Sequence, residues 1–327
     1  MKSSFRPSTP ADRAGIVALA QRAFGADPDA AFIDASLMRW KYWLPRDDFS
    51  EPRSFVMERN GRVIAHAGLW PVMAGGERGA HMIDWMSDPD APGAGVAVLQ
   101  RVAQRFDFLY TIGGSRMTIE ILPKFGFKHI GDAVTCARPL RPLRQVIHHQ
   151  YKDWRLPARL VRNLWWSLSP RPPSLSGWSA EPASASADPG PNEAFLRYLS
   201  TCPTATWLRL DIKKEGRRVG FMGLMTAQQQ SRIAGIWLAD PSVGRRDIAL
   251  ALAQRTLLAR STTAEILDRA FATAALQANE AAGMRARASD PVLVFKRNGN
   301  VDGLELSFEL AGNDAICLWE RAPTFLT

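Results

Sequence analysis

The chain has 327 residues, of which 46% are hydrophobic and 22% are charged, a composition typical of a globular protein of about two domains. No apolar run approaches the roughly 18 residues of a membrane span, and the polar N-terminal segment lacks the apolar stretch of a secretory signal, so we expect a cytoplasmic protein. The three cysteines are far apart in the sequence, which excludes a disulfide framework or a zinc spacing, and no metal site is expected.

The net charge of +9 is unevenly distributed along the chain. Between Arg138 and Gly177 there are eight basic residues and one acid, Asp153, so this segment carries +7 of the total. Because the flanking parts are nearly neutral, we do not expect nucleic acid as a partner.

The first half has the pattern of an α/β unit. Helices are expected at 12–24, capped by Asp12, and at 32–45, where Pro45 ends the second one. A hairpin over 54–72 turns at Asn60-Gly61. The later elements alternate, with a strand at 80–87, a helix at 95–106, a strand at 108–114, a short helix ending at Gly126 and a strand at 133–140.

The second half repeats this order about 155 residues later. Its hairpin turns at Glu215-Gly216, and the decapeptides NGRVIAHAGL and EGRRVGFMGL align Gly61 with Gly216. A steady offset indicates a duplicated unit. The later elements again alternate, with a strand at 231–239, a helix at 247–259, a strand at 264–272, a helix at 275–283 and a strand at 291–297.

A segment rich in proline and serine separates the two halves. Six prolines lie between Ser167 and Pro191, which excludes a helix or a central strand and predicts an extended surface linker. The sequence therefore predicts an α+β (mixed α/β) protein with similar domains at 1–139 and 192–327. A basic helix and the linker fill 140–191.

The loop after the strand at 80–87 has a pattern typical of an anion site. It leads through Gly93 and Gly95 into a helix, whose unpaired N–H groups and macrodipole favour a pyrophosphate. We expect both glycines to let the backbone approach the phosphates, and Ala97 to keep the first helical turn open.

The stretch Pro89–Leu99 resembles motif A of the GNAT superfamily of N-acetyltransferases, and the order of the elements also matches that family. The resemblance implies two GNAT-like domains, each a mixed, mostly antiparallel central sheet flanked by helices. It implies an acyl-CoA co-substrate, usually acetyl-CoA, and no metal. The pyrophosphate would lie on the loop and the pantetheine arm along the strand before it, which assigns as binding residues Pro92, Gly93, Ala94, Gly95, Val96, Ala97, Met86 and Ser87.

Two residues depart from the family pattern: Pro92 replaces a basic or amide residue, and Leu122 stands where that family has a tyrosine that can protonate the leaving thiolate. The implied reaction is direct acyl transfer to a primary amine, which needs a base. Asp84 and His66 are the candidate bases, and Ser115 is a candidate donor near the thiol. The alternatives are a strand aspartate that is satisfied by hydrogen bonds and a histidine buried in the core.

The second copy of the loop has Arg245 and Asp247 at the two glycine positions. Because a carboxylate there would repel a pyrophosphate, we expect no CoA in the second half.

The segment 141–168 predicts an amphipathic helix with a basic face, with Pro157 in its first turn. Its basic residues Arg155, Arg159 and Arg162 lie between apolar residues at Leu156, Leu160, Val161, Leu164, Trp165 and Leu168. One interpretation is a helix that packs across the two domains with its arginines in solvent. The other is peripheral contact with anionic membrane lipid.

These features favour an acyl-CoA-dependent N-acyltransferase whose acceptor is a small-molecule amine, such as an amino sugar. A FemX-like aminoacyltransferase, which also pairs two such domains, is a second interpretation that the intact glycine loop disfavours. A non-catalytic acyl-CoA-binding or scaffold protein is a third, and Leu122 favours it.

Overall fold

The computed structural model describes residues 3–147, 152–168, 173–183, 193–239, 245–260, 263–301, 304, 306, 308–319 and 325–327. The second-copy loop at 240–244 and the pair His148 and His149 lie outside the described residues. The chain forms two compact units. In the described part of the chain, no helix is long and apolar enough to cross a membrane.

Unit 1 comprises Met1–Asp132, Asp290–Leu306 and Gly312–Asp314. Its strands follow the order β1-β2-β3-β4-β5-β12, and every pairing is antiparallel except that of β4 with β5. The strands are β1 (Ser4–Pro7), β2 (Ser54–Arg59), β3 (Arg62–Ala74), β4 (Glu77–Ser87), β5 (Phe108–Ile112) and β12 (Arg285–Lys296).

The helices of unit 1 lie where the periodicity predicts them. In α1 (Arg13–Phe24), Ile16, Leu19 and Ala20 are buried, whereas Phe24 at the end of the helix is exposed. The second helix is α2 (Ala35–Met38) continued by a π-helical turn that ends before Pro45. The remaining helices are α3 (Ala94–Ala103) and α4 (Arg116–Ile121).

Unit 2 comprises Ala133–Ser289, Ser307–Ala311 and Ala315–Thr327. Its strands follow the order β6-β11-β10-β9-β8-β7, again antiparallel except for β10 with β11. They are β6 (Lys128–Pro139), β7 (Trp178–Pro182), β8 (Thr206–Lys214), β9 (Arg217–Ala227), β10 (Gln230–Leu238) and β11 (Glu265–Ala270). Its helices are α5 (Pro142–Gln145), α6 (Leu156–Leu168), α7 (Glu193–Ser200), α8 (Arg246–Ala259) and α9 (Thr273–Ala281).

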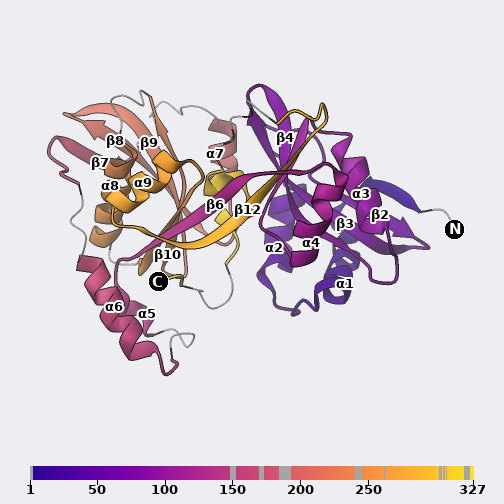
Figure 1. Ribbon diagram of the computed structural model, residues 1–327, viewed down its shortest axis with the longest axis horizontal. Helices are drawn as coiled ribbons and strands as arrows, with labels where there is room; N and C mark the ends of the chain where they lie inside the picture. Colours follow the sequence, from indigo (N-terminus) through magenta and orange to yellow (C-terminus); the bar gives the residue numbers. More distant parts are fainter. Residues whose placement is uncertain are drawn as a thin grey trace. The chain divides into compact units, whose positions relative to one another are not determined.

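The two units therefore have the same strand plan, and the expectation of a mixed α/β fold with mostly antiparallel strands flanked by helices is confirmed (Figure 1). Both hairpin turns are as predicted. Asn60 and Gly61 have φ of 53° and 75°, and Glu215 and Gly216 have 50° and 78°, so each turn has the two positive φ angles of a type I′ hairpin. The proline-rich linker contributes β7 at the edge of the unit 2 sheet, where the missing N–H groups of proline are tolerated.

The last strand of each sequence half completes the sheet of the other unit. β6 pairs with β11 through Val134–Pro139, and β12 pairs with β5 through Val292–Lys296. Cys136 accordingly belongs to the unit 2 core and Leu293 to the unit 1 core. The two units for this reason do not coincide with the segments 1–139 and 192–327 of the sequence analysis.

Candidate functional site

The sheet of unit 1 opens halfway along β4. β4 pairs with β5 only through Gly79–His81, and its register with β3 shifts between the partners of His66 and Gly68. At this bulge Asp84 has a φ of 47°, which is unusual for a residue other than glycine and often marks a functional position. The C-terminal half of β4 is thus not hydrogen-bonded to β5 in the described part of unit 1.

The Asp84 carboxylate lies in a buried cluster of charges. Lys41 donates from Nζ to Oδ2 of Asp84 at 2.6 Å, and the Tyr42 hydroxyl donates to the same oxygen. Lys41 is fully buried and also lies 3.5 Å from Oδ2 of Asp314, which comes from the C-terminal segment of the chain. The β4 bulge therefore carries one lysine between two carboxylates.

The two carboxylates of this cluster differ in acidity. Burial alone would raise the pKa of Asp84, but the charge of Lys41 and the hydrogen bonds from Lys41 and Tyr42 bring it below its ordinary value. Burial raises the pKa of Asp314 to about 6, and the nearby Asp84 charge adds to this rise while Lys41 opposes it. Burial and the Asp84 charge raise the pKa of Tyr42 well above its usual value, so its phenol is a neutral donor. Asp314 is thus the group that titrates nearest neutral pH.

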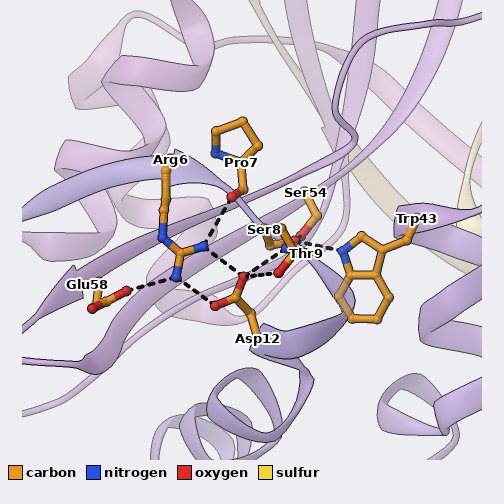
Figure 2. A network of polar contacts seen from close by, with 8 residues as sticks. All are labelled: Arg6, Pro7, Ser8, Thr9, Asp12, Trp43, Ser54 and Glu58. Carbon is orange, nitrogen blue, oxygen red and sulfur yellow. Dashed lines mark hydrogen bonds and ion pairs between the residues drawn. The ribbon is translucent and has the colours of Figure 1, made fainter.

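A chain of hydrogen bonds ends at the backbone of the β4 bulge. Trp43 donates from Nε1 to Ser8 Oγ at 3.0 Å, and Ser8 donates to Ser54 Oγ at 2.6 Å, as Figure 2 shows. Ser54 lies 2.9 Å from Nε2 of His66, and Nδ1 of His66 lies 3.0 Å from the Asp84 carbonyl oxygen. Because a carbonyl can only accept, Nδ1 carries the proton and Nε2 accepts from Ser54.

His66 is consequently satisfied at both ring nitrogens and fully buried. Burial lowers the pKa of His66 to about 4, so the ring is neutral near pH 7. The geometry fits the second sequence interpretation, a core histidine, and its bond to the Asp84 carbonyl positions the bulge.

Figure 2 also shows how β1, the strand that ends just before Ser8, is fixed. Arg6 of β1 lies between Asp12, at 2.7 Å, and Glu58 of β2, at 2.8 Å. The hydrogen bonds from Arg6 lower the pKa of Asp12 to about 2. This ion-pair network ties β1 to β2 and to the start of α1.

The glycine loop lies directly after β4. Gly93 is exposed, has a φ of 83°, and a Cβ there would meet nothing within 4 Å. No acidic residue lies in the first turn of α3. Pro92 is exposed, and Val96 and Ala97 are half-buried. The N-terminus of α3 thus has the open, uncharged character that a phosphate group requires.

Gly95 has a packing role that the sequence did not indicate. It is buried, and a Cβ there would lie 3.0 Å from Ser87 Oγ and 3.1 Å from Ser87 Cβ. Trp85 donates from Nε1 to the Gly95 carbonyl oxygen at 3.0 Å. Gly95 therefore allows α3 to pack closely against β4. Ala94 is also buried beside it.

The other predicted residues lie on β4 and at the start of α4. Met86 is buried and pairs with His66 of β3, and Ser87 pairs with Ala65. Ser115 is exposed and caps α4, where its Oγ accepts from the Thr118 N–H at 3.2 Å. Among the described residues the structure brings Asp84 and His66 together but gives Ser115 no contact with either.

Leu122 is fully buried in the apolar core of unit 1. The position at which the family motif has a tyrosine therefore has no hydroxyl and faces no open site.

Lys41, Tyr42 and Asp314 belong to the cluster but were not predicted from the sequence. A lysine in the otherwise aromatic and apolar run WKYWL was the available signal for Lys41, because a buried lysine needs a carboxylate partner. Asp314 lies far along the chain, and no local pattern marks it.

The corresponding opening of unit 2 is filled by the C-terminal segment. β10 pairs with β11 only through Gln230–Arg232. Beyond that point Glu309 accepts from the N–H of Ile236 at 3.4 Å and from Arg246 at 3.0 Å. A Cβ at Gly235 would lie 2.4 Å from Glu309. Glu309 therefore packs directly on β10.

Charged side chains complete this filled opening. Arg246 of α8 also binds Asp268 at 2.8 Å, and burial raises the pKa of Glu309. Asp247 lies in the first turn of α8 and pairs with Arg245 at 2.6 Å. The N-terminus of α8 thus already has a carboxylate beside it.

Comparison with known proteins identifies the fold. A scan against family models gives no match, and no curated protein matches the sequence. Among solved structures, a GCN5-related N-acetyltransferase from Sphaerobacter thermophilus is similar, with 16% identity, 90% of this chain and 95% of that chain covered, and a TM-score of 0.53. One from Anabaena variabilis has 13% identity, coverages of 92% and 74%, and a TM-score of 0.56.

A tandem GNAT protein from the clavulanic acid biosynthesis pathway is similar over nearly its whole length. The match has 13% identity, covers 90% of this chain and 98% of that chain, and has a TM-score of 0.52. The fold is therefore that of the GNAT N-acetyltransferases, as the motif in the glycine loop predicted.

Proposed function

We propose that this chain, which has the GNAT fold, is an acyl-CoA-dependent N-acyltransferase that acts on a small primary amine in the cytoplasm. Unit 1 is the catalytic unit in this proposal. The observation that carries it is that an open helix N-terminus at Gly93 lies directly after a β4 bulge whose Asp84 belongs to a buried lysine–carboxylate cluster.

The residues of unit 1 fit an acyl-CoA. In the loop Pro92–Ala97, the N–H groups of Gly93, Gly95 and Val96 would hold the pyrophosphate. The half of β4 that does not pair with β5, at Met86 and Ser87, would hold the pantetheine arm. Acetyl-CoA is the first co-substrate to test. In unit 2, Glu309 and Asp247 would oppose the same anionic ligand, so we expect one CoA per chain.

The proposed reaction is attack of the neutral amine on the thioester carbonyl carbon. A C–N bond forms, the C–S bond breaks, and CoA leaves as its thiolate. The proton lost by the amine goes to a carboxylate of the cluster. Asp314 suits this role better than Asp84, because its pKa of about 6 lies nearer the working pH and a general base is most effective there.

Lys41 and Asp84 would orient Asp314. Above pH 6 the cluster of one lysine and two carboxylates has a net negative charge, which attracts a substrate ammonium. Leu122 cannot protonate the leaving group, but a thiol with an ordinary pKa of about 8.5 leaves as a thiolate without assistance at mildly alkaline pH.

The test has two stages. In the first stage, acetyl-CoA, longer acyl-CoAs and free CoA are titrated by calorimetry. A ligand present at 100 times its Kd should also raise the free energy of unfolding by about 2.7 kcal/mol. Release of free CoA thiol is then followed with a panel of amino sugars, polyamines and amino acids. Asp314→Asn should retain binding and lower turnover by about a hundredfold, within the usual range for losing a general base. Absence of acyl-CoA binding would contradict the proposal.

A non-catalytic acyl-CoA-binding protein is the second candidate, and the buried Leu122 favours it. Binding of acetyl-CoA with one site per chain, but no amine-dependent thiol release across the panel, would support this candidate instead.

A further inference from the structure

Exposed apolar side chains concentrate on α6 and the residues before it in unit 2. In the described part of the chain, seven of the eleven large exposed hydrophobic side chains lie between 143 and 168. Trp154 is 84% exposed, Trp165 70% and Leu168 82%. The sequence analysis left two interpretations open for this helix, packing across the two domains or contact with anionic lipid, and the exposure of these side chains favours the second.

The exposed side chains form a stripe along α6. At about 100° per residue, Val161, Leu164, Trp165 and Leu168 of α6 fall within about 120° of arc. Trp154 lies in the turn just before α6 begins at Leu156, and we call these five residues the α6 stripe. α6 lies beside α5 at one end of unit 2 (Figure 1). An apolar stripe of this width normally packs against another surface.

The opposite face of α6 already holds the helix in place. Asn163 and Trp166 are buried, and they bond to Gln145 at 3.0 Å and to the Gly283 carbonyl at 3.1 Å. Arg285 lies over the Trp166 ring, 5.0 Å from its centroid. The α6 stripe is therefore not needed to fold unit 2.

Basic side chains flank the stripe. Lys152, Arg155 and Arg162 are exposed, and the Arg155 guanidinium lies 5.0 Å from the Trp154 ring centroid. The one acid of the segment, Asp153, pairs with Arg159. A partner of this surface must therefore be apolar at its centre and negatively charged at its edge.

We propose that the α6 stripe docks unit 2 on an anionic lipid bilayer. A helix that lies in the membrane surface has an apolar face with tryptophan and leucine and a basic flank. Tryptophan prefers the interface between headgroups and acyl chains, and arginine reaches the lipid phosphates while its aliphatic stem stays on apolar surface. Nucleic acid would match the charge but not the apolar centre.

The test is flotation of the full chain with vesicles of phosphatidylserine and phosphatidylcholine, compared with pure phosphatidylcholine, at low and high salt. We expect binding to the anionic vesicles only, weakened by salt. Trp165→Ser with Leu168→Ser should lower binding by at least about tenfold. Arg155→Gln with Arg162→Gln should lower it by about fivefold for each charge.

Met73→Ser with Leu258→Ser is the matched control, because both side chains are exposed and apolar but lie outside α6. This variant should bind as the wild type does. Equal vesicle binding by the α6-stripe variant, or no binding to anionic vesicles, would overturn the proposal. So would a dimer in sedimentation that the α6-stripe substitutions abolish, since a second copy would then cover the stripe.

Discussion

The β4–β5 opening of unit 1 and the β10–β11 opening of unit 2 have the same backbone plan, with three paired residues and then a separation of the two strands. In unit 1 the opening has a bulge at Asp84 beside Lys41, and an uncharged helix N-terminus follows it. In unit 2 Glu309 packs on the β10 backbone and Arg246 pairs with it. The backbone plan thus does not determine whether a unit can have the site that we propose, because the side chains that lie in the opening differ.

The largest effect is expected where a buried cation is removed. Lys41→Met leaves Asp84 and Asp314 buried without their shared lysine and should destabilise the protein by about 3–5 kcal/mol in urea unfolding. Adding Asp84→Asn and Asp314→Asn should recover most of that loss. If the triple variant is no more stable than Lys41→Met, the two unpaired carboxylates are not the cause of the lost stability.

Arg246→Met is the matching change in unit 2, since it leaves the carboxylates of Asp268 and Glu309 without their shared cation. We expect a similar loss of stability but unchanged acyl-CoA binding. If this variant keeps its fold but no longer binds acyl-CoA, then acyl-CoA binding does not depend on unit 1 alone as we propose.

The two helix N-termini, at Gly93 in unit 1 and at Asp247 in unit 2, are compared by their affinity for acetyl-CoA. Gly93→Asp adds a carboxylate beside the proposed pyrophosphate, where two unit charges at about 4 Å repel by roughly 4 kcal/mol at an effective dielectric constant of about 20. Because the loop is exposed, we expect less than this, about a hundredfold loss of acetyl-CoA affinity in calorimetry. Asp247→Gly should leave the stoichiometry at one. A second site appearing in Asp247→Gly would mean that Glu309 does not block unit 2.

Much of the fold could be predicted from the sequence because its signals are local. The turns at Asn60-Gly61 and Glu215-Gly216, the helix around Ile16 and Leu19, and the glycine loop need only neighbouring residues. The sequence could not predict that β6 pairs with β11 of unit 2 and β12 with β5 of unit 1. The apolar pattern of a strand does not identify the strand that lies beside it.

The site was predicted only in part for the same reason. Asp84 and Gly93 lie in a short motif, whereas Asp314 reaches the cluster from a distant segment. Gly95 shows the limit of a motif, since the sequence cannot separate a glycine needed for phosphate from one needed for packing on Ser87.

The pH dependence of stability separates two groups of unit 1. His66 has a folded pKa of about 4, below its ordinary 6.5, so its contribution is lost as the pH falls from 6.5 towards 4. Asp314 has a folded pKa of about 6, above its ordinary 3.8, so it acts in the opposite direction and stability is lost as the pH rises through that window.

In the wild type these two effects oppose each other. Asp314→Asn removes the effect of Asp314 and leaves that of His66. The free energy of unfolding of this variant should therefore increase more between pH 4 and 6.5 than that of the wild type, by at least about 1.4 kcal/mol. Urea unfolding at several pH values measures it. Parallel curves for the two proteins would contradict the raised pKa of Asp314.

The smallest effect is expected at Ser115, and it tests whether the sequence assigned that residue correctly. Its Oγ caps α4 by accepting from Thr118, so Ser115→Ala should cost about 1 kcal/mol of stability, the usual loss for a helix cap. Ser115→Asp keeps a cap but adds a charge, and should restore the stability. If Ser115 only caps the helix, both variants should release CoA thiol within about twofold of the wild-type rate, since about 0.4 kcal/mol in the barrier corresponds to that factor. A tenfold slower release in Ser115→Ala with unchanged acyl-CoA affinity would instead assign Ser115 a role in the chemistry, and the unit 1 site would then extend from the β4 bulge to the start of α4.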